Sequence, residues 1–189
     1  MSQLTLENEE AGIQTLDMTA GLYGMQWEVK VHAGVNLDMS AERKVTVRGD
    51  FTNLPFKDGS FETILFDPPH TVDSRNTLLG SMDHYHGGDP HLATFKYGCY
   101  RSIKQLGEAV FNGAKEASRV LKPGGMMLFK WSDSEKPFSW AHDRVRKAAP
   151  DFENIKMRLA NSRAHSGNLT IYIWYRKATI MAYKPEANE

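Results

Sequence analysis

The sequence predicts an α/β fold with a Rossmann-like, doubly wound and mostly parallel sheet that ends in an antiparallel C-terminal hairpin strand. Three observations predict it. Short strand-like runs alternate with helix-like runs, proline and glycine separate them, and the last two strand-like runs face each other across a polar turn. A composition of 41% hydrophobic and 24% charged residues is that of an ordinary globular protein rather than a disordered chain.

A length of 189 residues indicates one domain. We predict a flexible N-terminus over 1–10, the domain itself over 11–183, and a charged tail over 184–189. Within the domain, residues 71–96 are polar and have little periodicity, so we expect a lid or insertion there.

The individual elements follow from hydrophobic patterning. We predict strands over 12–18, 35–39, 44–48, 61–67, 126–131, 154–159 and 169–176. Apolar residues at three- and four-residue spacing predict a helix over 94–121, which the sequence KPGG at 122–125 should end. A shorter helix is expected over 139–149, and the turn over 161–168 should join the two last strands into the hairpin.

Aspartates stand at or beside the ends of the first four predicted strands: Asp17, Asp38, Asp50 and Asp67. Ligands of such sheets bind in the crevice outside the carboxyl ends of the strands. A crevice with four carboxylates suits a ligand with hydroxyls, an amine and a positive centre, and it disfavours phosphates. The chain also lacks the glycine patterns of dinucleotide-binding and P-loop proteins.

Charge and cysteine usage limit the partners and the compartment. Lysine plus arginine and aspartate plus glutamate both number 23, so tight nonspecific binding of nucleic acid is not expected, although a local basic patch remains open. The single cysteine, Cys99, fits a reducing compartment, and no apolar run approaches the ~20 residues of a membrane span. We therefore predict a cytoplasmic protein without a membrane partner.

Two motifs carry a family resemblance. The run RGDFTNLPF at 48–56, followed by DGSFETI at 58–64, and the run RVLKPGG at 119–125 resemble class I S-adenosylmethionine-dependent methyltransferases. With DPPH at 67–70 and FKW at 129–131, the chain resembles a phage- and prokaryote-type branch of them. Its first glycine turn is degenerate, because DMTAG at 17–21 replaces the usual D-x-G-x-G-x-G.

The resemblance implies S-adenosyl-L-methionine as the cofactor and assigns its contacts. Asp17 and the turn residues Thr19, Ala20 and Gly21 would lie along the methionine part, and Asp38 would accept hydrogen bonds from the ribose hydroxyls. At the next strand end, Asp50 would bind the adenine amino group with Phe51 beside it. Asp67 would border both the cofactor and the methyl acceptor.

The sequence Asp67-Pro68-Pro69-His70 resembles the D-P-P-[YFW] motif of enzymes that methylate exocyclic amines of nucleic-acid bases. A carboxylate and a fixed prolyl carbonyl can accept both amine hydrogens, while the fourth residue stacks on the base. We predict these four residues as catalytic and a base in DNA or RNA as the acceptor. A small-molecule or protein acceptor is the alternative, in which the motif only ends a strand, and a noncatalytic cofactor- or metal-binding module is a further one.

Other polar residues are candidates for substrate contacts. With His70, they are Arg75, Lys130, Arg163 and His165. Residues 83–91 have the composition of a metal site, but their spacing matches no standard zinc pattern, so we expect a solvated lid and no metal.

Overall fold

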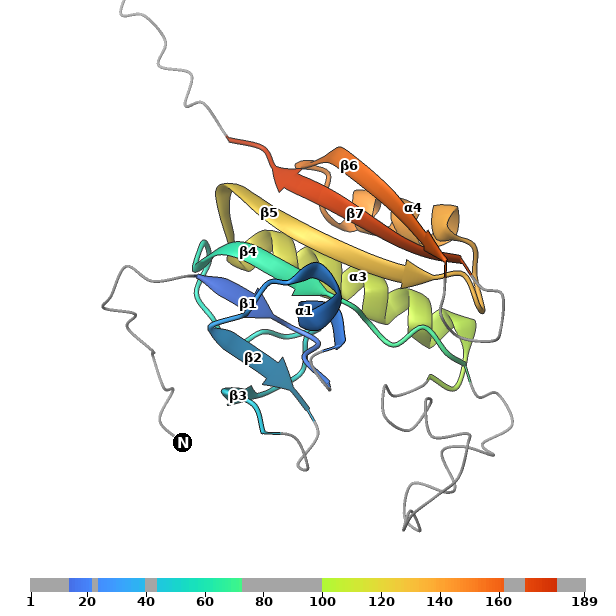
Figure 1. Ribbon diagram of the computed structural model, residues 1–189, viewed down its shortest axis with the longest axis horizontal. Helices are drawn as coiled ribbons and strands as arrows, with labels where there is room; N and C mark the ends of the chain where they lie inside the picture. The colour runs from blue at the N-terminus through green and yellow to red at the C-terminus, as the bar shows by residue number, and fades with distance from the viewer. Residues whose placement is uncertain (1–13, 22–23, 40–43, 73–99, 162–168, 180–189) are drawn as a thin grey trace, which may run out of the picture.

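Seven strands form one sheet in the order β3-β2-β1-β4-β5-β7-β6 (Figure 1). The computed structural model describes residues 14–21, 24–39, 44–72, 100–161 and 169–179. The strands are β1 (Thr15–Asp17), β2 (Val35–Asp38), β3 (Val47–Arg48), β4 (Phe61–Phe66), β5 (Leu121–Ser132), β6 (Phe152–Asn161) and β7 (Leu169–Lys177).

Strands β1 to β5 pair in parallel, whereas β7 runs antiparallel to both β5 and β6. This arrangement confirms the predicted parallel sheet with an antiparallel C-terminal hairpin. Because five strands run in the same direction, their carboxyl ends meet at one edge of the sheet (Figure 1).

Helices cover both faces of the sheet. α3 (Ile103–Val120) and α4 (Phe138–Ala148) lie on one face, over a core that includes Phe66, Phe129 and Trp131. The short helix α1 (Gly24–Val29) lies on the other, where Met25 packs with residues of β4, β5 and β7. The sequence did not predict α1, because its six residues are too few to show a helical period.

Several predicted boundaries were wrong: β3 begins at Val47 rather than at residue 44, and the starts of the long helix and of β5 differ most. The long helix was expected from residue 94, but residues 100–102 precede it, since Ser102 is the N-cap whose hydroxyl accepts a hydrogen bond from the Gln105 N–H. Residues 94–99 lie outside the described residues. The next strand was expected from residue 126, yet β5 begins at Leu121 and contains the KPGG run, with an irregularity in its pairing to β4.

Arg119, the first residue of the RVLKPGG motif, anchors the loop between β3 and β4. Its guanidinium donates to the carbonyls of Leu54 and Phe56 at 3.0 and 2.7 Å, and it pairs with the carboxylates of Asp58 and Glu116. Glu116 in turn accepts from the Leu54 N–H at 2.7 Å. One arginine of α3 therefore fixes the whole connection that follows β3.

Gly113 of α3 lies where two aromatic rings meet the helix. A Cβ at this position would lie 2.6 Å from Phe66 Cζ and 2.9 Å from Phe51 Cδ2. Phe66 is fully buried and also packs against Phe129, so its ring has no room to move away. The glycine thus permits the close packing of α3 on Phe51.

We expect Gly113→Ala to destabilise the protein by about 1–3 kcal/mol through overpacking, more than the ~1 kcal/mol gained in helix propensity. Gly107→Ala on the same helix is the matched control, because its nearest contact is Arg144 Nε, at the end of a flexible side chain. Urea unfolding measures both variants. Equal stability of the two would contradict the packing role of Gly113.

Candidate functional site

The carboxyl edge of the parallel strands brings three of the predicted aspartates together. Asp17 and Asp38 are the last residues of β1 and β2, and Asp67 follows β4 directly. The turn after β1 connects them: the Asp67 N–H donates to Thr19 Oγ1 at 2.8 Å, and the Gly21 N–H donates to Asp38 Oδ2 at 3.0 Å. Three carboxylates are therefore neighbours at the carboxyl edge of β1, β2 and β4.

Asp17 stabilises the turn after β1 through hydrogen bonds. Its side chain is 1% exposed, and its two oxygens accept from the Thr19 N–H at 3.2 Å and from Gln26 Nε2 at 2.8 Å. Burial, and to a smaller extent the neighbouring carboxylates of Asp67 and Asp38, raises its pKa to about 6, although the hydrogen bonds from Gln26 and Thr19 oppose the shift. A positive ligand group in the crevice would favour the ionised form of this carboxyl group.

This burial predicts a pH-dependent stability. Because the folded protein holds the Asp17 proton more tightly than the unfolded chain, the contribution of this group is full below pH 4 and is lost as the pH rises through about 6. The loss should reach about 3 kcal/mol by pH 7. We expect urea unfolding of Asp17→Asn to show a stability that rises relative to the wild type between pH 4 and 7. A difference that stays constant with pH would contradict the prediction.

The turn at Thr19–Gly21 takes the place of a glycine-rich loop. Gly21 has a φ of 48°, a left-handed conformation that suits glycine, and the Ala20 N–H donates to the Leu37 carbonyl at 3.0 Å. The turn therefore folds back over the end of β2. This geometry brings the predicted contacts Thr19, Ala20 and Gly21 next to Asp38.

Asp50 and Phe51 lie one strand further along the same edge. Asp50 Oδ1 accepts from both the N–H and the hydroxyl of Thr52 at 2.8 Å, so it shapes the loop that Arg119 anchors. The half-buried ring of Phe51 lies 5.6 Å from that of Phe66. The loop thus carries an exposed carboxylate at Asp50 and, at the next position, a half-buried ring that packs on Phe66.

A cation and two carboxylates meet where β4, β5 and α1 come together. Lys130 Nζ lies 3.1 Å from Asp67 Oδ2 and 3.0 Å from Glu28 Oε2. The hydroxyl of Tyr172 on β7 donates to Glu28. Although burial opposes it, the charges of Asp67 and Glu28 raise the pKa of Lys130 well above its usual value. Lys130, predicted to contact substrate, thus fixes Asp67 in place.

His70 ends the DPPH motif against the core. Its ring makes an edge contact with Trp131 at 6.1 Å between centroids, and its Nδ1 is buried with no hydrogen-bond partner in the described part of the chain. Burial lowers the pKa of His70 below its usual value, so the neutral imidazole is favoured at pH 7. Pro68 is buried and Pro69 half-buried.

Several predicted features lie outside the described residues: Arg75, Cys99, Arg163, His165, the segment 83–91 and the insertion except for its first two residues. The described residues on either side of 73–99 meet, because Val72 bridges Tyr100 and the Tyr100 N–H donates to the Thr71 carbonyl at 3.0 Å. The described residues contain no cluster of three or more metal-ligating side chains. None of the described helices has the length and hydrophobicity to cross a bilayer.

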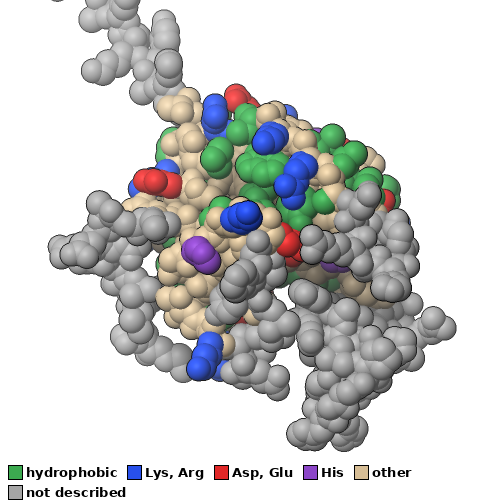
Figure 2. All heavy atoms as spheres, in the orientation of Figure 1, with side chains coloured by type: hydrophobic (Ala, Val, Ile, Leu, Met, Phe, Trp, Pro, Cys, Tyr) green, Lys and Arg blue, Asp and Glu red, His purple; other side chains and the backbone are tan. Residues whose placement is uncertain are grey.

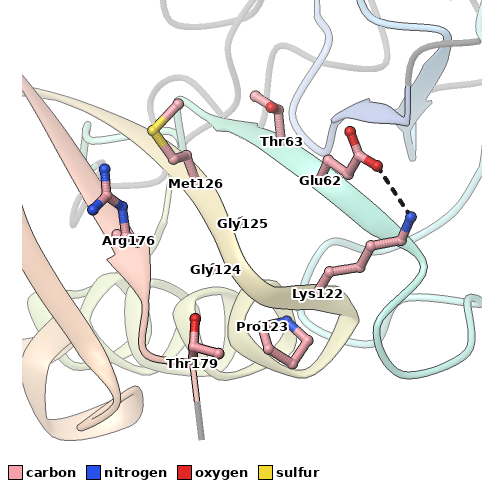
Figure 3. Close-up of a pocket in the computed structure, with 9 residues that line it drawn as sticks. All are labelled: Glu62, Thr63, Lys122, Pro123, Gly124, Gly125, Met126, Arg176 and Thr179. Carbon is pink, nitrogen blue, oxygen red and sulfur yellow. Dashed lines mark hydrogen bonds and ion pairs between the residues drawn. The ribbon is translucent and has the colours of Figure 1, made fainter. Parts of the chain in front are cut away.

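A hollow at the opposite edge of the sheet is separate from this site (Figure 3). Residues of the KPGG run line it together with Glu62 and Arg176, and Lys122 Nζ lies 3.3 Å from Glu62 Oε1. It opens near the amino ends of β4 and β5. The Asp67 cluster lies at their carboxyl ends.

The sequence reasoning missed Glu28, Gln26 and Tyr172. Glu28 and Gln26 belong to α1, which was not predicted, and Tyr172 faces α1 from β7. The alternation of side chains along β7 was a usable signal, since it puts Tyr172 on the face opposite Ile171 and Ile173.

No family model and no curated protein matches this sequence. Solved structures do match its fold. The [4+2]-cyclase SpnF is 13% identical, with a TM-score of 0.53 over 90% of this chain and 76% of that one. A Burkholderia thailandensis 1,6-didemethyltoxoflavin-N1-methyltransferase with bound S-adenosylhomocysteine is 14% identical, with a TM-score of 0.52 over 87% and 70%.

A S-adenosylmethionine-dependent methyltransferase from Methanosarcina mazei is similar as well, at 13% identity and a TM-score of 0.50 over 87% of this chain and 92% of that one. These likenesses show the Rossmann-like fold of such methyltransferases. The cyclase among them shows that activity has to be argued from the site itself.

Proposed function

We propose that this protein is a S-adenosylmethionine-dependent N-methyltransferase whose acceptor is an exocyclic amino group of a nucleic-acid base. The observation that carries the proposal is the position of Asp67. It lies at the carboxyl end of β4, where its carboxylate accepts from Lys130 and its backbone N–H donates to Thr19 Oγ1 in the turn after β1. One residue thus joins the expected cofactor and acceptor positions.

The described residues fit the cofactor. Its positive charges match the carboxylate of Asp17, its ribose hydroxyls match that of Asp38, and the Phe51 ring after Asp50 suits the adenine. The bound cofactor supplies an activated methyl group. A structural neighbour named as an N1-methyltransferase holds S-adenosylhomocysteine, which supports methylation of nitrogen with this cofactor.

The acceptor amine becomes a better nucleophile toward the methyl group when its two hydrogens are donated in hydrogen bonds. Its lone pair is delocalised into the base, and hydrogen bonds to the Asp67 carboxylate and the Pro68 carbonyl favour the nucleophilic form of the nitrogen. The cofactor, held by the turn after β1, would supply the methyl group from its sulfonium centre, and Asp67 would accept the proton that the amine loses on methylation. Positioning by Lys130 and the two prolines supplies most of the rate enhancement.

His70 would flank the base. The neutral imidazole, which lies against Trp131, would stack on an unpaired base through its flat ring. A small-molecule amine is the second candidate. The balanced charge of the chain and the N1-methyltransferase neighbour favour it.

Calorimetry with S-adenosylmethionine, followed by transfer of labelled methyl to DNA, RNA, free nucleosides and a metabolite extract, tests the proposal. We expect cofactor binding and label in a base. Label only in small molecules other than nucleosides would contradict the nucleic-acid base and indicate a small-molecule acceptor. Absence of cofactor binding would overturn the proposal as a whole.

A further inference from the structure

One half of the sheet is not covered by a described helix on the α1 side. There, strand register aligns side chains in rows across β5, β7 and β6. Three of these rows are Met126–Arg176–Glu153, Leu128–Trp174–Lys156 and Lys130–Tyr172–Arg158. Figure 2 shows blue basic side chains over green apolar ones in this region. We call Lys156, Arg158, Arg176 and Trp174 the cationic face.

The charge of this face is not balanced. Lys130 is paired with Asp67 and Glu28, which leaves Glu153 as the carboxylate within the rows. Lys156, Arg158 and Arg176 are exposed, and none of them forms an ion pair with a described residue. The surface is therefore locally basic although the whole chain has a formal net charge of zero.

Two aromatic rings support the cations. Lys156 Nζ lies 5.2 Å from the centre of the Trp174 ring, and Arg158 Cζ lies 5.0 Å from that of Tyr172. The Trp174 ring is half-buried, so part of it stays open to solvent. Cations combined with an accessible aromatic ring on a sheet are typical of surfaces that bind single-stranded nucleic acid.

The cationic face is continuous with the Asp67 site. The row Lys130–Tyr172–Arg158 begins at Lys130, which contacts Asp67 at 3.1 Å, and runs outwards to the edge strand β6. Three strand spacings separate β4 from β6, a distance of about 14 Å. Lys156 and Arg158 are two residues apart on β6, so they lie about 7 Å apart.

We infer that the cationic face binds the sugar–phosphate backbone of a single-stranded nucleic acid next to the nucleotide at Asp67. The choice of this partner over an acidic peptide rests on the proposed function, because the adjoining site would take a base. A single strand fits better than a duplex, since an unpaired base reaches Asp67 without being extracted from a helix.

Fluorescence anisotropy of the full chain with labelled DNA and RNA oligonucleotides of about 12 nucleotides, at several salt concentrations, tests this inference. The variant is Lys156→Gln/Arg158→Gln. The matched control is Lys115→Gln/Lys147→Gln, which removes the same charge from exposed positions on α3 and α4. We expect the slope of log affinity against log salt to become shallower by about 1.4 in the variant, and the affinity to fall roughly tenfold at about 0.1 M salt. The control should match the wild type.

Equal oligonucleotide binding by the variant and the control would overturn the inference. So would wild-type binding of polyglutamate, with the same number of charges, as tightly as the oligonucleotide. Absence of oligonucleotide binding by the wild type would overturn it as well. Methylation separates this result from the proposed function. If the function holds and the inference fails, kcat/KM on the oligonucleotide stays unchanged in the variant. If the function fails, neither oligonucleotides nor free nucleosides acquire label in a base, whatever the binding data show.

Discussion

Replacing Asp67 with alanine should lower the rate of methyl transfer by about 100- to 10,000-fold, the range for loss of a group that accepts a proton in the transition state. The affinity for S-adenosylmethionine should change little, because the turn after β1 bonds the backbone N–H of Asp67 rather than its side chain. Single-turnover transfer of labelled methyl and calorimetry measure the two quantities.

Asp143→Ala is the control for this experiment, since Asp143 is an exposed carboxylate on α4, on the opposite face of the sheet. Removal of Asp67 leaves Lys130 with Glu28, so the variant should still fold. Full activity in Asp67→Ala would make the DPPH motif a structural corner at the end of β4. A parallel loss of cofactor affinity would instead assign Asp67 to the cofactor.

Much of the carboxyl edge could be predicted from the sequence because its residues follow the strands directly. Apolar runs that end in an aspartate place Asp17, Asp38 and Asp67 at the ends of parallel strands, and the structure confirms those positions. The hairpin strand was equally visible, since two β-rich runs flank a polar turn. Local sequence patterns were therefore enough to predict the position of a residue that directly follows a strand.

The sequence was not enough where distant segments meet. Lys130 is 102 positions from Glu28 and 63 from Asp67 along the chain, and its pairing depends on α1 lying over β5. α1 itself is too short to be recognised by its period. Arg119 could be named as part of a motif, but its bonds to the Leu54 and Phe56 carbonyls follow from the packing of α3 under the β3–β4 loop.

Replacing Asp38 with alanine should weaken the binding of S-adenosylmethionine by about 100-fold, equivalent to ~3 kcal/mol for two hydrogen bonds to a charged acceptor. Asp38 is the last residue of β2. Its Oδ2 accepts from the N–H of Gly21, in the turn where the methionine part of the cofactor is expected. The loss in affinity has two sources, the ribose contact and the support of the turn, and calorimetry of the single variant measures only their sum.

A cofactor analogue that lacks a ribose hydroxyl separates the two sources. If Asp38 binds that hydroxyl, the wild type should lose affinity for the analogue, whereas Asp38→Ala should bind the analogue and the natural cofactor equally. If Asp38 only supports the turn through Gly21, both proteins should lose the same factor on removal of the hydroxyl. Asp38→Asn adds a further test, because it keeps an oxygen for the Gly21 N–H and removes the charge. If Asp38→Asn keeps the hydrogen bond to Gly21 but still binds S-adenosylmethionine weakly, the charged carboxylate contacts the ribose.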